Sequence, residues 1–98
     1  FEQSNYPYHV SARTHDQTPF PIPLHEVWEI MSENLFYMTN AYGFEIHSFV
    51  LMNNHYHLLV STPKCNLSQG MQWFGQEFTK TINRISNRKN QLWGGRYY

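Results

Sequence analysis

The sequence has little of what most enzyme motifs require. Its 98 residues include one cysteine, Cys65, so neither an internal disulfide nor a paired metal-thiolate motif can form. A glycine-rich phosphate loop and a Gly-X-Ser-X-Gly nucleophile turn are also absent. No stretch has the length or apolarity of a signal peptide or a membrane span. These absences exclude P-loop, zinc-finger and serine-hydrolase chemistry, and they favour a reducing, cytoplasmic setting with no membrane partner.

Basic residues are scarce in the first half of the chain. Residues 1–50 contain one base, Arg13, against six acids, a net charge of −5, whereas residues 51–98 contain six bases against Glu77, a net charge of +5. Such asymmetry favours a polyanionic partner for one surface, although a basic helix face can also be merely solvated. The candidate phosphate contacts all follow residue 79 and are Lys80, Arg84, Arg88, Lys89 and Arg96.

Composition bounds the size and class of the protein. A hydrophobic content of 41% with 17% aromatic residues is typical of one globular domain with a modest core. The chain begins with Phe1 rather than Met, and it ends at Tyr98 inside what resembles a structural element. We therefore expect residues 1–98 to be a single domain, truncated at both ends, from a longer reading frame.

The spacing of apolar residues predicts the order of the elements. Alternation predicts strands over residues 5–14, 44–52 and 55–61, and residues 93–98 resemble the beginning of a fourth. Helical spacing predicts one helix from Leu24 to about residue 42, between Pro23 and Gly43, and another after Asn66, which resembles a capping box with Gln69. The order β-α-β-β-α-β predicts an α+β, ferredoxin-like fold: an antiparallel four-stranded sheet with two helices on one face. Its open strand edge is compatible with a homodimer.

The triplet His55-Tyr56-His57 is the main candidate site. Side chains two apart on a strand share a face, so its two imidazoles can converge on one ion, or they can simply be half-buried histidines with hydrogen-bond partners. A two-residue Asn53-Asn54 turn would place Met52 opposite His55. One face then carries Ile46, Ser48, Val50, Met52, His55, His57 and Leu59, and the other carries His47, Phe49, Leu51, Tyr56, Leu58 and Val60. The second face is more apolar, so we expect the helices to cover it and leave the histidine pair open.

Several segments together resemble a known family. They are Tyr8-His9-Val10, the block from Phe49 to Val60 (FVLMNNHYHLLV), Thr62-Pro63, Asn66-Leu67 with Met71, and Leu92-Trp93-Gly94-Gly95-Arg96-Tyr97. In this order they resemble the REP-associated tyrosine transposases, within the HUH superfamily of single-strand DNA nucleases. The resemblance covers nearly the whole chain.

The resemblance implies a metal-dependent DNA reaction. It implies that His55 and His57 bind Mg²⁺ or Mn²⁺, and that a tyrosine attacks the scissile phosphate of single-stranded DNA beside a hairpin, forming a 5′-phosphotyrosine link. Because hard ions favour oxygen ligands, a two-histidine site favours manganese or a mixed site, and we expect a third ligand outside the pair. The nucleophile is expected beyond Tyr98, since Tyr97 and Tyr98 belong to the earlier Arg-Tyr segment, so this stretch alone should be inactive.

Other residues keep two interpretations each. His9 could contact substrate or orient the histidine pair, or it could be an ordinary half-exposed histidine. Trp73 and Trp93 could stack on unpaired bases or pack in the core. His15, His25 and His47 have no spacing that favours ligation. The alternative to an enzyme is a ferredoxin-like module that binds single-stranded or hairpin nucleic acid without chemistry.

Overall fold

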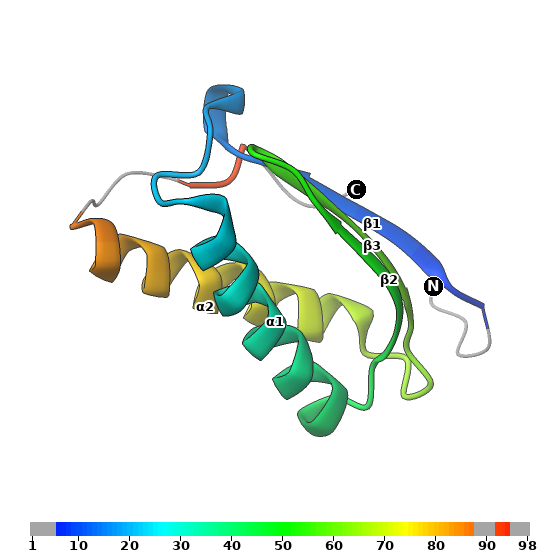
Figure 1. The fold of residues 1–98 in the computed structure, drawn as a ribbon. Helices are drawn as coiled ribbons and strands as arrows, with labels where there is room; N and C mark the ends of the chain where they lie inside the picture. The colour runs from blue at the N-terminus through cyan, green and yellow to red at the C-terminus, as the bar shows by residue number, and fades with distance from the viewer. Residues whose placement is uncertain (1–5, 88–91, 95–98) are drawn as a thin grey trace.

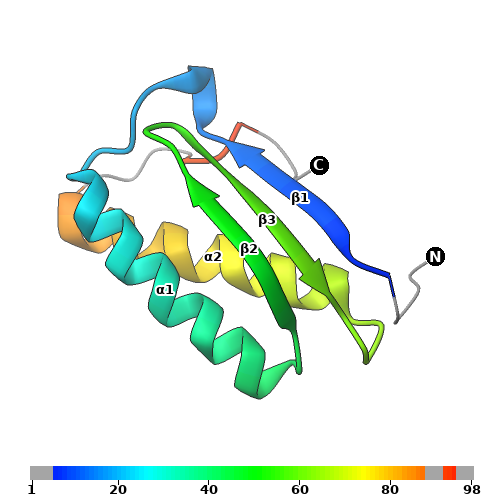
Figure 2. The ribbon, with the colours of Figure 1, turned by 45° about the vertical axis from the view of Figure 1, so that its right-hand side comes forward.

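The computed structural model describes residues 6–87 and 92–94. In chain order the elements are strand β1 (Tyr8–Arg13), 3-10 helix η1 (His15–Gln17), helix α1 (Leu24–Ala41), strands β2 (Glu45–Leu51) and β3 (His55–Ser61), and helix α2 (Leu67–Ser86). The strands form one antiparallel sheet in the order β1-β3-β2. Both helices lie on one face of it, as Figures 1 and 2 show from two directions. Neither described helix is long and apolar enough to cross a membrane.

The predicted four-stranded sheet is wrong for the described residues, which form three strands. Trp93 makes only an isolated antiparallel bridge with Thr14, flanked by hydrogen bonds from His15 N to Leu92 O (2.7 Å) and from Gly94 N to Arg13 O (2.8 Å). This bridge lies beside the end of β1, at the edge of the sheet away from β2. The rest of that predicted strand, residues 95–98, lies outside the described residues.

The predicted helix boundaries are confirmed at Pro23 and Gly43. Pro23 is the N-cap of α1, and Gly43, with φ of 71°, follows the C-cap and turns the chain into β2. The predicted capping box at the start of α2 is wrong, because the Asn66 side chain makes no cap hydrogen bond. Its amide instead donates to Tyr42 O (2.9 Å), which ties the start of α2 to the end of α1.

The core lies between the helices and the sheet. Its fully buried side chains come from every layer, and the largest are Phe44, Phe74, Phe78, Met31, Met38, Leu58, Ile82, Val10, Val27, Val60 and Thr62. The predicted helical stripes are confirmed except at their margins, where Leu24, Trp28 and Ile85 are about half exposed. Gly70 faces Phe44 so closely that an added Cβ would lie 2.2 Å from the Phe44 Cζ. A glycine is therefore required where α2 crosses the start of β2.

The register of the hairpin is confirmed, with one exception. Val50 pairs with His57 and Ser48 with Leu59, as the Asn53-Asn54 turn predicted. A β-bulge between Ile46 and Ser48 then inserts His47 as an extra residue. Ile46 consequently packs against the core instead of sharing the histidine face. The His47 side chain is exposed, and its imidazole forms a hydrogen bond with the Ser61 hydroxyl (2.7 Å). The predicted faces of Ile46 and His47 are therefore exchanged.

Replacing Gly70 by alanine should destabilise the fold, because the new methyl group has no room beside the Phe44 ring. The expected loss is about 1–3 kcal/mol in the free energy of unfolding, which outweighs the better helix propensity of alanine. Urea denaturation followed by circular dichroism measures it. Gly75→Ala is the matched control, since its Cβ would meet only Trp93 Nε1 at 3.8 Å. Equal stability of both variants would contradict the packing argument.

Candidate metal centre

Tyr56, the middle residue of the triplet, is buried in the core. Its side chain is 2% exposed, and its ring makes edge-on contacts with Phe74 (5.5 Å between ring centres) and Trp93 (5.7 Å). Because strand residues alternate faces, burial of Tyr56 turns His55 and His57 to the opposite side of the sheet. That side carries no helix (Figure 2), and both histidines are half-buried there.

The two imidazoles lie close together on the open face of the sheet. Their ring centres lie 5.1 Å apart and their planes are at 89°. A metal–nitrogen bond of about 2 Å places each ring centre a little over 3 Å from the ion, so two rings bound to one ion would have centres about 5 Å apart, whatever the angle between their planes. The donor set is therefore compatible with a divalent ion, provided that further oxygen ligands complete it.

Asn54 fixes the tautomer of His55. The Asn54 amide nitrogen donates to Gln17 O (2.9 Å), so its oxygen Oδ1 faces the His55 Nδ1 at 2.7 Å. An amide oxygen only accepts, and Nδ1 must therefore carry the proton. The lone pair of neutral His55 is then on Nε2, the nitrogen that remains for a metal.

His9 has the corresponding place beside His57. β1 lies next to β3, and the His9 Nε2 is 3.2 Å from the His57 Nδ1, with the ring centres 5.1 Å apart and the rings stacked. A lone pair on His57 Nε2 requires that Nδ1 donates to His9. In that state both members of the pair are held through Nδ1 and present Nε2.

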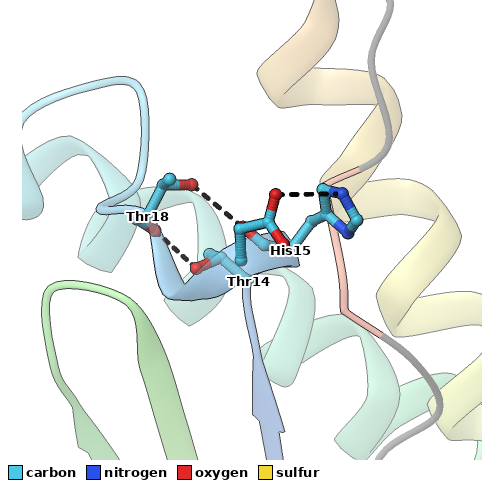
Figure 3. A network of polar contacts seen from close by, with 4 residues as sticks. Thr14, His15 and Thr18 are labelled. Carbon is cyan, nitrogen blue, oxygen red and sulfur yellow. Dashed lines mark hydrogen bonds and ion pairs between the residues drawn. The ribbon is translucent and has the colours of Figure 1, made fainter.

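The turn that carries Asn54 is held by the loop around η1. Thr14 N donates to Asn54 O (2.9 Å), and Phe20 N donates to Asn53 O (2.8 Å). The loop is itself closed by hydrogen bonds from the Thr14 hydroxyl to Thr18 O and from the Thr18 hydroxyl to His15 O (3.1 Å), both drawn in Figure 3. The orientation of His55 thus depends on contacts that reach back to the end of β1.

The pKa of His55 lies below its ordinary value of 6.5. Burial is the main cause, and the positive charges of Arg13 and of protonated His57 add to it. Because the folded state prefers neutral His55, the unfolded chain takes up the proton first as the pH falls through 6.5. The folded state therefore loses stability as the pH falls from 6.5 to the lower folded pKa, and the neutral form of His55 persists below pH 6.5.

The two predicted phosphate contacts that the structure describes, Lys80 and Arg84, do not lie next to the histidine pair. Lys80 and Arg84 are exposed on α2, across the sheet from it, and Lys80 also lies 3.8 Å from Glu77. Three further predicted contacts, Arg88, Lys89 and Arg96, lie outside the described residues, as do Tyr97 and Tyr98. Trp93 packs on Phe20, Phe78 and Tyr56, and Trp73 stacks on Tyr37 at 4.4 Å, which favours packing roles for both tryptophans.

Two neighbours of the site were not predicted from the sequence. Asn54 was assigned only to the turn, although its position directly before His55 is a signal that it could orient that ring. Arg13 pairs with His55 across β1 and β3, which only the strand register shows. Within residues 6–87 and 92–94, no three His, Cys, Asp or Glu side chains cluster as metal ligands would, so the expected third ligand stays a prediction.

The fold is that of known transposases. The chain aligns along its whole length with a REP-associated tyrosine transposase solved bound to a REP hairpin, with 14% identity and a TM-score of 0.73, and it covers 56% of that protein. It aligns equally completely with a candidate transposase from Deinococcus radiodurans R1, with 16% identity and a TM-score of 0.72, covering 82% of it. None of the curated proteins is significantly similar in sequence.

The sequence itself identifies the family. Residues 2–98 match the family described as "Transposase IS200 like". The chain therefore belongs to the IS200-like transposase family, as the resemblance to REP-associated tyrosine transposases indicated. It spans about half the length of the hairpin-bound relative.

Histidine NMR should show His55 as the Nδ1–H tautomer, with protonation centred below pH 6.5, because Asn54 accepts from Nδ1 and burial disfavours the cation. Asn54→Ala should leave a tautomer mixture. Asn53→Ala is the control, since Asn53 contacts the loop through its backbone oxygen. Long-range ¹H–¹⁵N correlation spectra distinguish the tautomers, and an Nε2–H signal from wild-type His55 would contradict the assignment.

Proposed function

We propose that this chain is the metal-binding core of a transposase that nicks and joins single-stranded DNA near hairpins. The observation that carries the proposal is the arrangement of His55 and His57, two imidazoles at right angles on an open sheet face. Membership of the IS200-like transposase family supports it. A structural relative described as bound to a REP hairpin supports the choice of substrate.

In the proposed reaction, His55 and His57 would hold Mg²⁺ or Mn²⁺ through Nε2. The ion would neutralise the negative charge that develops on the scissile phosphate. Asn54 and His9 keep the two rings oriented, so no rearrangement is needed when the phosphate arrives. A tyrosine from outside the described residues would attack phosphorus, release a 3′-hydroxyl and form a 5′-phosphotyrosine, which another 3′-hydroxyl then resolves.

The basic face of α2 is the proposed contact for a more distant part of the DNA. Lys80 and Arg84 are exposed, and such side chains bind phosphates without reading sequence. Since they lie across the sheet from the histidine pair, one DNA molecule contacting both regions would have to pass around an edge of the sheet. Arg88, Lys89 and Arg96 remain part of this proposal on the basis of sequence alone.

One observation favours the alternative, a module that binds nucleic acid without chemistry. The described residues provide no cluster of three metal ligands, and neither Tyr8 nor Tyr56 shares the face of the sheet that carries the histidine pair. A module of this kind would use the same surfaces for binding. It would neither depend on a divalent ion nor form a covalent bond to DNA.

Isothermal titration calorimetry should detect weak manganese binding to the wild-type chain. His57→Ala should bind at least about tenfold more weakly, because one of two imidazole ligands is lost. The matched control is His25→Ala, which removes an exposed imidazole from α1 on the other layer and should bind as the wild type does. Indistinguishable titrations for wild type and His57→Ala would remove the metal site from the proposal.

The full reading frame that encodes this chain should form a covalent adduct with labelled hairpin DNA carrying a single-stranded flank, provided that manganese is present. The adduct is visible as a labelled band in a denaturing gel, because a phosphotyrosine link survives denaturation. His57→Ala should abolish the band, and His25→Ala should retain it. Tight DNA binding without any adduct would favour the non-catalytic module.

A further inference from the structure

Arg13 is the one base in the first 50 residues, and the fold places it beside the histidine pair. It ends β1, and its Cα partner on β3 is His55. Its predecessor Ala12 is buried at 5% exposure, so alternation turns the exposed Arg13 side chain to the open face. The backbone is fixed there, since Arg13 O accepts from Gly94 N at 2.8 Å.

The guanidinium of Arg13 is not used within the fold. It forms no hydrogen bond or ion pair with any described residue. A guanidinium has five donors in a planar fork that matches the oxygens of a phosphate, and an unpaired one beside a candidate site has its donors free for a ligand. Apart from Arg13, the lysines and arginines in the described part of the chain are Lys64 in a loop and Lys80 and Arg84 on α2.

The position of Arg13 also has an electrostatic cost. Arg13 pairs with His55 across the two strands, and both side chains face the open side of the sheet. The guanidinium would therefore repel any cation held by His55. An anion between the guanidinium and such a cation would be attracted by both positive charges and would offset their repulsion, so the arrangement favours a ligand that carries a phosphate.

We infer that Arg13 binds a backbone phosphate of single-stranded DNA on the open face of the sheet, next to the divalent ion that His55 and His57 are proposed to hold. This inference rests on the proposed function for the identity of the ligand. It adds a phosphate contact to the set predicted from sequence, which is Lys80, Arg84, Arg88, Lys89 and Arg96. Arg13 is thus a substrate-positioning residue on the same face as the histidine pair.

The test measures binding of a fluorescent single-stranded oligothymidylate by anisotropy, with manganese or with chelator, over a range of salt concentrations. Arg13→Gln should bind the DNA about tenfold more weakly, and the slope of log affinity against log salt should fall by about one. Arg13→Lys should keep the slope and lose part of the affinity, because the charge remains without the fork. Lys64→Gln, which removes one charge after the other end of β3, should behave as the wild type does.

Calorimetry with manganese alone separates this inference from the proposed function. Arg13→Gln should bind manganese as tightly as the wild type or more tightly, whereas a damaged fold would bind it less well. If wild type binds no manganese but Arg13→Gln still loses DNA affinity, the phosphate contact stands and the metal-dependent function fails. If Arg13→Gln binds DNA as tightly as Lys64→Gln does, the inference is overturned.

Discussion

The orientation of β3 depends on the burial of its inward side chains, Tyr56, Leu58 and Val60, and the ring of Tyr56 lies between the two histidines in sequence. Its edge-on contacts with Phe74 and Trp93 join the middle of the sheet to α2 and to the segment after it. Turning the strand over would expose this ring and place two imidazoles in the core, where their polar nitrogens would need new partners. The hydrophobic core thus decides that His55 and His57 face outward, although neither histidine belongs to the core.

The sheet separates two kinds of chemistry. On the covered side, α2 carries exposed bases above a packed aromatic core, and on the open side histidines from β1 and β3 contact one another directly. The open side has its own network of support, because Asn54, His9 and the loop around η1 hold the rings by hydrogen bonds. A small domain can therefore keep a polar site oriented on a surface that no helix covers.

Much of this arrangement could be predicted from sequence, because alternation and turn chemistry are local. The hairpin register was predicted correctly from the two-residue Asn53-Asn54 turn, and the face that the helices cover was predicted correctly from its apolar residues. The bulge at His47 has no local signal, since one extra residue does not alter composition. The Asn54–Gln17 contact and the pairing of Arg13 with His55 join segments far apart in the chain, so they needed the tertiary structure. The Asn66 side chain could bond either to the first turn of α2 or to a distant residue, and in the structure its amide donates to the Tyr42 carbonyl instead of capping the helix.

The bulge in β2 has a consequence for how the family diverges. Skipping His47 leaves Ile46 opposite Val60 and Ser48 opposite Leu59, which is already the pattern of a regular strand. Deleting His47 would therefore leave every neighbouring side chain of β2 on the face of the sheet where it now lies. Deleting Ile46 or Ser48 instead would change which residues face the core. An alignment of relatives that is guided by structure should accordingly place a gap at His47, at a point where strands normally tolerate none.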